Sequence, residues 1–167
     1  MNNIIVNFWN KEKDKILWSK KPKKLLKYKS KGFLWFDDGK LNVAENCIKK
    51  NLDKNLGKKN AIHYIKENGE EYSFTYNDLS NLVFNFSLFL KKKNKSSGPI
   101  FIHSSASIEA SISMLSAAKL GIKHCVIFEE LEDEAISKRL ELINPGIVIT
   151  KTSNIKKITY FKKAQKK

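Results

Sequence analysis

The chain has 167 residues, enough for one domain with a buried core, and its formal net charge is +15 from 32 basic and 17 acidic residues. Arg139 is the single arginine, which argues against a dedicated nucleic-acid surface because such surfaces rely on arginine for bidentate contacts. Cys47 and Cys125 are too far apart for a CxxC metal motif, so free thiols in a reducing cytosol are expected. No apolar run approaches the ~18 residues of a membrane span, and no signal peptide is evident, so we predict a cytoplasmic protein without membrane contact.

Residues 4–36 contain all three tryptophans, Trp9, Trp18 and Trp35, set among lysines and interrupted by a proline and a glycine. Such a segment is poorly suited to form a core of its own. We expect it to wrap along a larger body, held by its aromatic side chains. Aromatics interleaved with basic residues are also compatible with stacking on single-stranded nucleic acid, and that alternative stays open here.

A first helix is predicted to begin at Asn42, because Glu45 three residues later completes a capping-box pattern. Its apolar positions recur at helical spacing, so the helix should run to about Asn55 and stop near Gly57.

Two alternating runs in the segment AIHYIKENGEEYSFTY flank Asn68 and Gly69. Asn-Gly between strand-like runs predicts a β-hairpin, because both residues tolerate positive φ. Thr75 and Asp78 then predict a second capped helix, whose apolar stripe continues to Leu90.

The stretch from Pro99 to Thr150 alternates short apolar runs with helix-like segments, which predicts the order β-α-β-α-β. Gly121 is placed to end the first of these helices, and Asn144 with Pro145 to end the second. Two consecutive units of this kind give parallel strands joined by right-handed crossovers. We therefore predict an α/β fold with a partial parallel β-sheet and flanking helices, preceded by a wrapping N-terminal extension and a β-hairpin.

The residue types that usually carry catalysis are present without the spacing of a catalytic motif. His63, His103 and His124 each lie in a strand-like run with no evident acidic or nucleophilic partner, so we interpret them as packing residues. The serines of residues 104–116 lack a G-x-S-x-G elbow, which disfavours a hydrolase, and Ser105 or Ser107 is predicted to cap the following helix. The acidic cluster of residues 129–134 is explained by helix capping and the helix dipole, without a metal.

Four blocks of sequence together resemble a known family: WFDDGKLNVAENC (35–47), FTYNDL (74–79), SIEASISMLSAAKLGIKHCVIF (107–128) and DEAISKRL (133–140). In this order and spacing they closely resemble the N-terminal part of the AMP-forming acetyl-CoA synthetases, within the adenylate-forming acyl-CoA synthetase superfamily. The resemblance implies a two-step ligase that uses ATP, Mg²⁺ and coenzyme A, with an acyl-adenylate intermediate.

The family's Ser/Thr/Gly-rich phosphate loop and its other ATP-site motifs have no counterpart among these 167 residues. Neither G-x-x-x-x-G-K-[ST] nor G-x-G-x-x-G occurs, and seven scattered glycines do not build a phosphate cradle. We therefore expect a truncated segment that binds no cofactor by itself and has no catalytic residues of its own.

The resemblance also marks four positions that match the family's coenzyme A contacts. Glu129 and Glu130 stand where the family has Gly-Gly, and two carboxylates would repel the phosphates of the coenzyme. Lys156 and Thr159 stand where the family has arginines, and neither offers a bidentate fork. Two family prolines are replaced as well, by Ser105 and Ile108. These changes predict impaired coenzyme A binding.

The expected organisation is an acetyl-CoA-synthetase-type extension over residues 1–55, the first part of an AMP-binding domain over 56–150, and a frayed or loosely docked basic tail over 151–167. Two further hypotheses stay open. In the first, the chain is a non-catalytic partner that docks on a separately encoded remainder of the enzyme. In the second, it is a basic nucleic-acid-binding module. No specific nucleic-acid sequence is expected as a partner.

Overall fold

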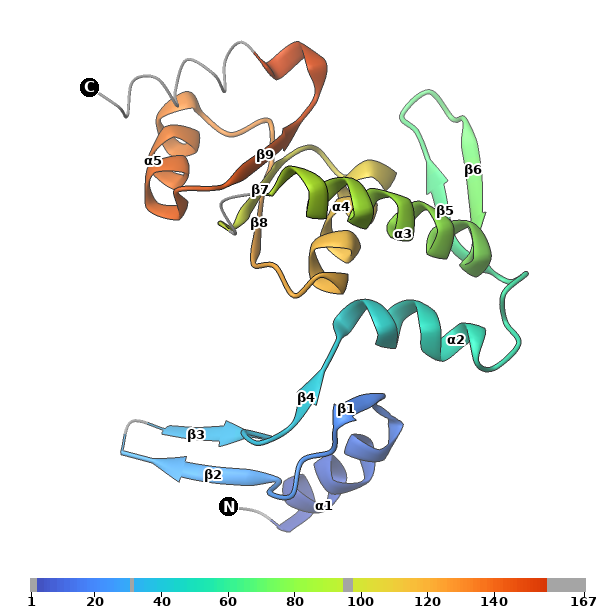
Figure 1. Ribbon diagram of the computed structural model, residues 1–167, viewed down its shortest axis with the longest axis vertical. Helices are drawn as coiled ribbons and strands as arrows, with labels where there is room; N and C mark the ends of the chain where they lie inside the picture. The colour runs from blue at the N-terminus through green and yellow to red at the C-terminus, as the bar shows by residue number, and fades with distance from the viewer. Residues whose placement is uncertain (1–2, 31, 95–97, 156–167) are drawn as a thin grey trace.

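The computed structural model describes residues 3–30, 32–94 and 98–155 (Figure 1). In its N-terminal part the helix and strands are α1 (Asn3–Glu12), β1 (Trp18–Lys20), β2 (Leu26–Lys29), β3 (Gly32–Trp35) and β4 (Lys40–Leu41). β1 pairs antiparallel with β4, and β2 pairs antiparallel with β3. These elements lie together at one end of the molecule, and the chain leaves them through β4 toward the larger part.

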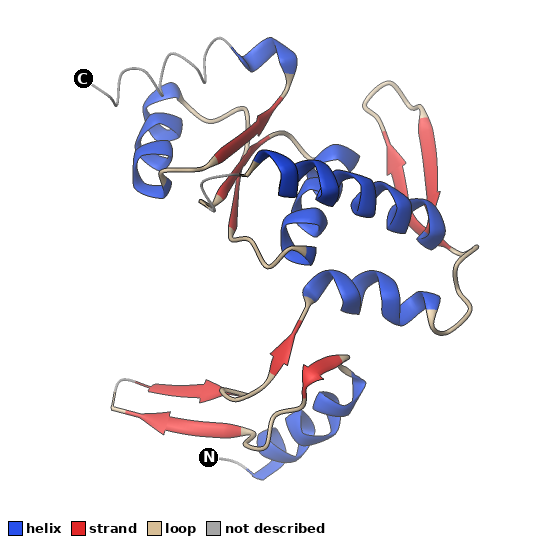
Figure 2. Ribbon diagram, viewed as in Figure 1, coloured by secondary structure: helices blue, strands red, loops and turns tan. Residues whose placement is uncertain are grey.

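The larger part is built on three parallel strands, β7 (Ile100–His103), β8 (His124–Ile127) and β9 (Ile147–Thr150), in the order β8-β7-β9 (Figure 2). All four residues of the central strand β7 are buried, which explains why its sequence is almost entirely apolar. The predicted strand order along the chain and the parallel pairing are both confirmed.

Helices cover both faces of this sheet. Leu90 of α3 (Tyr76–Lys93) and Ala117 of α4 (Ile108–Lys119) pack with Ile100 and Ile102 on one face. Leu140 and its neighbours on α5 (Asp133–Ile143) pack with Phe101 on the other. Successive residues of a strand point to opposite faces, so β7 contributes to both cores. The predicted α/β class is confirmed.

The helix ends follow the predicted local signals. Thr75 and Asp78 form a complete capping box at the start of α3, with the Thr75 hydroxyl accepting from the Asp78 N–H at 3.2 Å. Gly121 has φ of 68° after α4, and Asn144 has φ of 44° after α5. Both are the left-handed residues that end helices. Within the described ranges, no helix is both long enough and apolar enough to cross a bilayer.

The first predicted helix is confirmed, with a different end. It comprises residues 43–52 and includes a π-type segment, Glu45–Lys49, before α2 (Lys50–Leu52). Asn42 does cap it, since its side-chain oxygen accepts from the Glu45 N–H at 3.2 Å. The helix ends at Leu52, and the left-handed residue in the turn that follows is Asn55, with φ of 59°, rather than Gly57. Asparagine tolerates the left-handed conformation, so the helix needs no glycine.

The hairpin of β5 (Asn60–Ile65) and β6 (Glu71–Thr75) is present where Asn68-Gly69 predicts it. Among the described residues of its turn, only Gly69 has a positive φ, of 84°. The Gly69 N–H donates to the Lys66 carbonyl and the Lys66 N–H donates to the Glu70 carbonyl. The turn is therefore longer than the two-residue turn that Asn-Gly favours.

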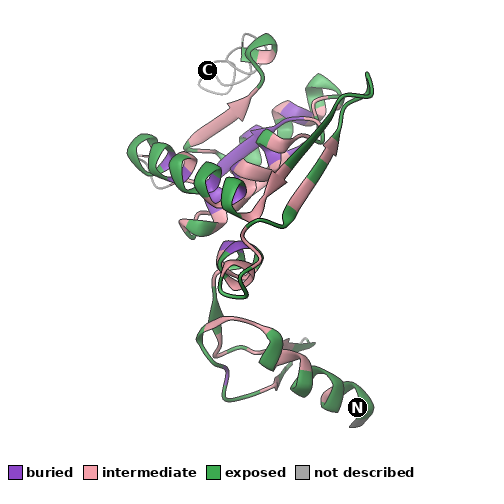
Figure 3. Cartoon of the chain, turned by 90° about the vertical axis from the view of Figure 1, so that its right-hand side faces the viewer, coloured by how far each residue is buried: buried purple, intermediate pink, exposed green. Residues whose placement is uncertain are grey.

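The N-terminal extension differs from its prediction in how it is held. Its tryptophans contact other aromatics of the extension, as in the pairs Trp9 with Trp35 and Trp18 with Phe36. Its links to the helix of residues 43–52 are polar instead: the Asn46 side chain accepts from the Leu17 N–H at 2.8 Å and donates to the Leu17 carbonyl at 2.9 Å, and Lys50 donates to the Lys15 carbonyl. Figure 3 shows the extension as mostly exposed or half-buried. An asparagine amide fits this position because it pairs with a peptide group as another peptide would.

Candidate functional site at the carboxyl ends of the parallel strands

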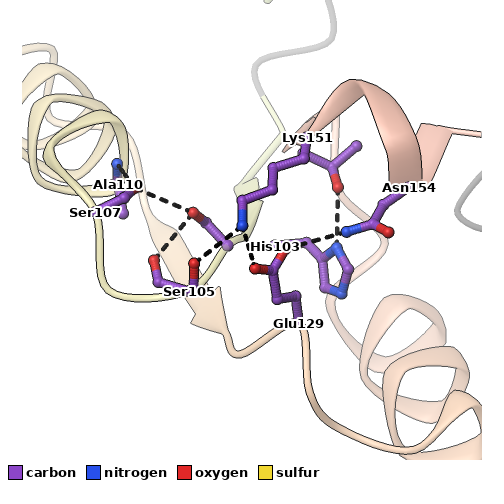
Figure 4. Close-up of polar contacts among 9 residues, drawn as sticks. His103, Ser105, Ser107, Ala110, Glu129, Lys151 and Asn154 are labelled. Carbon is purple, nitrogen blue, oxygen red and sulfur yellow. Dashed lines mark hydrogen bonds and ion pairs between the residues drawn. The ribbon is translucent and has the colours of Figure 1, made fainter. Parts of the chain in front are cut away.

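Polar side chains gather where the three parallel strands end. The loop after β7 carries Ser104, Ser105 and Ser107, the turn after β8 carries Glu129, and the segment after β9 carries Lys151 and Asn154 (Figure 4). In open α/β sheets, ligands bind outside the carboxyl ends of the strands. This edge is therefore the candidate site.

Glu129 is the centre of the cluster. Its Oε1 accepts a hydrogen bond from the Lys151 ammonium, and its Oε2 accepts one from Asn154 Nδ2 at 3.1 Å. Lys151 also donates to Ser105 Oγ at 3.2 Å. The Lys151 contact holds the pKa of the Glu129 carboxyl below its usual value, and the same contact raises the pKa of Lys151. Both groups are charged at neutral pH, so the cluster carries a compensated ion pair.

The serines beside this pair have structural partners. Ser107 is the residue that caps α4, because its hydroxyl accepts from the Ala110 N–H at 3.1 Å, as predicted for one of the two candidates. The Ser104 hydroxyl donates to the Ser105 carbonyl at 3.0 Å. Because the cap fixes Ser107 at the helix start, the loop presents Ser105 toward Lys151.

The histidines differ in their surroundings. His103 is buried, as predicted, and its Nδ1 lies 2.9 Å from Thr150 Oγ1, which ties the end of β7 to the end of β9. His63 and His124 are exposed, so the prediction that they are packing residues is wrong. His63 also has an acidic partner, because the hairpin brings its Nε2 within 2.8 Å of Glu71 Oε2. His124 begins the edge strand β8, which exposes it.

Of the two roles predicted for the acidic cluster after β8, the structure supports the interaction with the helix dipole. Glu132 precedes α5 without a side-chain capping bond, while Asp133 and Glu134 stand in the first turn, where negative charge complements the helix dipole. Capping by the Glu132 side chain is thus not part of the explanation. In the part of the chain that the structure describes, no group of three or more metal-ligating side chains is close enough to hold a metal ion.

Two of the four positions predicted from coenzyme A contacts lie in this edge. Glu129 and Glu130 are adjacent in the turn after β8, and both line a hollow of about 870 Å³ that the hairpin turn closes on its other side. Glu130 is exposed, whereas Glu129 is drawn into the polar cluster. Lys156 and Thr159 lie outside the described residues.

Sequence reasoning did not identify Lys151 and Asn154 as partners of Glu129. They are the first and fourth residues after β9, in the segment predicted to be frayed or loosely docked, and this beginning of the tail is held by Glu129. The available signal was the strand prediction itself, because carboxyl ends of parallel strands share one edge of the sheet.

The geometry does not favour a phosphate group at this turn. A phosphate here would meet the Glu129 carboxylate, and Lys151, the cation of the cluster, is already paired with that carboxylate. Like charges in a partly buried position repel strongly. The polar edge thus fits the class of nucleotide-binding α/β folds in topology, and its central residue, Glu129, is an anion that is already paired.

Comparison with known proteins identifies the family. Residues 49–167 match the family described as AMP-binding enzyme, and residues 3–47 match the acetyl-coenzyme A synthetase N-terminus. The chain belongs to the AMP-binding enzyme family, whose acyl-CoA synthetases use ATP and coenzyme A.

Curated relatives agree with this assignment. An acetyl-coenzyme A synthetase of Streptomyces coelicolor is 30% identical over 147 residues, covering 87% of this chain and 23% of the relative. One from Leptospira biflexa is 35% identical over 148 residues, covering 86% of this chain and 22% of the relative. This chain therefore spans less than a quarter of the length of these relatives.

A solved structure supports the fold. Acetoacetyl-CoA synthetase from Streptomyces lividans matches with a TM-score of 0.73 at 17% identity, covering 87% of this chain and 23% of that chain. At this identity the likeness concerns the fold alone.

Proposed function

We propose that this chain supplies the N-terminal extension and the first part of the AMP-binding domain of an acetyl-CoA-synthetase-like enzyme, and that it has no ligase activity by itself. The family matches support the first half of the proposal, because they follow one another along the chain over residues 3–47 and 49–167. The curated relatives that carry the activity are more than four times longer than the matched segment.

The chemistry of the relatives requires groups that these 167 residues do not supply. Activation of a carboxylic acid by ATP needs backbone amides and cations arranged around the phosphates before the reaction begins. The sequence holds no glycine-rich phosphate loop. The carboxyl edge of the sheet, where an anionic ligand would be expected, carries the carboxylate of Glu129.

Pyrophosphate exchange tests the absence of activity directly. The purified chain, incubated with acetate, Mg²⁺, ATP and labelled pyrophosphate, should incorporate no label into ATP above a blank without protein. A full-length acetyl-coenzyme A synthetase, such as the Leptospira biflexa relative, serves as the positive control. Acetate-dependent exchange by the purified chain would refute the proposal.

A second candidate is a non-catalytic subunit that docks on a separately encoded remainder of the enzyme. The observation that favours it is that the sheet has unpaired edges and that a helix beside it exposes apolar side chains. Among the described strands, β8 and β9 each pair with β7 alone, and α3 exposes large apolar side chains, among them Phe84, Leu88 and Phe89. Unpaired strand edges and exposed apolar faces are surfaces on which a partner binds.

Co-expression distinguishes the two candidates. The chain would be produced together with the complementary C-terminal portion of the Leptospira biflexa relative, each with a different affinity tag. Docking predicts that the two copurify in a fixed ratio. Failure to copurify, with soluble yield of both unchanged, would rule docking out and leave the first proposal standing.

A further inference from the structure

The Glu129 carboxylate occupies a donor set of the kind that binds anions. Three polar groups converge on it or on its immediate partner: the Lys151 ammonium, the Asn154 amide N–H₂ and the Ser105 hydroxyl, which lies 3.2 Å from Lys151 Nζ. They come from the segments that follow β9 and β7, while the carboxylate comes from the turn after β8 (Figure 4). A cation with neutral donors beside it is how proteins hold carboxylate and phosphate oxygens.

This pair differs from the other ion pairs among the described residues. The acidic side chains of those pairs are between 29% and 78% exposed, whereas that of Glu129 is 16% exposed. Most of the pairs join residues on the molecular surface, where solvent screens them and the net contribution is small. Glu129 instead gives each of its two oxygens a separate partner, and of the two charged side chains in this pair the carboxylate is the less exposed, since Lys151 is 51% exposed.

There is room for an external ion at this place. Lys151 lines two hollows, one of about 340 Å³ between β7, α4 and β9, and one of about 870 Å³ between the sheet edge and the hairpin turn. Ser105 and Glu129 line the larger one, which is open to solvent. Removal of the Glu129 side chain would leave Lys151 and Asn154 without the carboxylate that accepts from them, and would leave Lys151 and Ser105 facing a hollow that Glu67 and Glu130 still line.

We infer that Lys151, Asn154 and Ser105 form a binding site for a small oxyanion, a carboxylate or a phosphate, and that Glu129 occupies this site as a built-in ligand. In the resting chain the site is closed to external anions. Substitution of Glu129 by a residue without a carboxylate opens it. This inference concerns the isolated chain and stands whether or not the chain docks on another polypeptide.

The test is a gain of binding. Isothermal titration of the full chain with inorganic phosphate, and separately with acetate, at constant ionic strength would compare the natural protein with Glu129→Ala. We expect the variant to bind at least one of the two anions about tenfold or more tightly, as gaining charge-assisted hydrogen bonds implies. The anion whose affinity increases more shows whether the donors suit a planar carboxylate or a tetrahedral phosphate.

Three controls keep the result specific. Glu134→Ala makes the same change of net charge in an exposed pair with Lys138 and should leave both affinities unchanged. The double variant Glu129→Ala, Lys151→Met should lose the binding that Glu129→Ala gains. Circular dichroism checks that each variant is folded. Glu129→Gln, which keeps the size of the side chain, provides a second folded variant and should bind more weakly than Glu129→Ala because its amide still fills the site.

Either of two results would overturn the inference. One is a folded Glu129→Ala protein that binds phosphate and acetate no more tightly than the natural chain. The other is a gain in affinity that the Glu134→Ala protein shares, because that gain would come from the change of net charge alone.

Discussion

Single side chains join the elements of this molecule, because they hydrogen-bond backbone groups that helices and strands leave unpaired. Asn42 is an example, since its oxygen caps the helix of residues 43–52 while its nitrogen donates to the Ala118 carbonyl at 3.0 Å, at the end of α4. Asn46 joins the same helix to the extension. Both asparagines belong to the block LNVAENC, so this motif has a structural reason that needs no ligand.

The capping box of α3 predicts a pH dependence of stability. Hydrogen bonds from the Thr75 side chain and backbone hold the pKa of Asp78 below its ordinary value of 3.8. A carboxyl with a lowered pKa stabilises the folded state above its unfolded pKa, and that contribution is lost as the pH falls through the folded pKa. Between pH 6 and pH 3, the difference in free energy of unfolding between the natural protein and Asp78→Asn should therefore shrink.

Urea denaturation at both pH values measures this difference. In a Thr75→Ala background, which removes the hydroxyl, the pH dependence due to Asp78 should be reduced. A difference that stays constant from pH 6 to pH 3 would contradict the role assigned to the carboxylate.

Gly39 makes a prediction of close packing at the residue scale. A Cβ at this position would lie 2.8 Å from Trp18 Cζ3 and 3.2 Å from both the Phe36 carbonyl oxygen and Pro22 Cβ. Overpacking of this kind typically costs about 1–3 kcal/mol. Gly39→Ala should shift the tryptophan fluorescence of the extension and lower its unfolding midpoint; an unchanged spectrum would show that the extension repacks freely.

At the scale of elements, the two faces of β7 explain why α4 and α5 lie on opposite sides of the sheet. Phe101 points to α5, and Ile100 and Ile102 point to α3 and α4. The Ser116 hydroxyl adds a buried hydrogen bond of 3.1 Å to the Val83 carbonyl, which joins α4 to α3. Each helix is therefore held by an apolar stripe that matches one face of one strand.

A pair of leucines on α5 tests that arrangement. Leu140 is 0% exposed and packs with Phe101 and Ile136, while Leu142 is 86% exposed on the same helix. Leu140→Ala should lower the free energy of unfolding by about 2–5 kcal/mol through lost burial and a cavity. Leu142→Ala should change it by no more than about 0.5 kcal/mol. Equal effects in urea denaturation would mean that α5 does not pack on the sheet.

For the whole molecule, the net charge of +15 predicts how the chain meets polyanions. The charge is almost entirely lysine, which attracts phosphates without the bidentate geometry that reads bases. We expect weak retention on DNA columns that falls steeply with salt, with two duplexes of unrelated sequence giving the same elution salt. A clear preference for one duplex would instead support the nucleic-acid-binding hypothesis.

Local interactions made much of this fold predictable. Several features depend only on residues close together in the sequence. They are the capping box at Thr75, the helix ends at Gly121 and Asn144, the hairpin at Gly69 and the three apolar strands. Their signals are therefore present in any short window of the sequence. The α/β class and the parallel order follow from the alternation of these local elements.

The candidate site was predictable only in part. Glu129 and Glu130 were identified from the family pattern, but the pattern did not reveal that Glu129 has its own cation and amide. Lys151 is 22 residues from Glu129 and 46 from Ser105. No local rule links residues at such separations.

The sequence by itself therefore determined the family, through its motif blocks, and the helices, hairpin and parallel strands of residues 43–150, because periodicity and capping act over a few residues, whereas α1 and β1–β4 of the extension were not predicted. Only the tertiary structure decided that Glu129 is paired with Lys151 and hydrogen-bonded by Asn154, that Asn42 reaches Ala118, and that the tryptophans of the extension contact its other aromatics. These contacts depend on two crossovers and a hairpin bringing distant segments to one place. Parallel strands end at a common edge, and that edge places Glu129 beside Lys151.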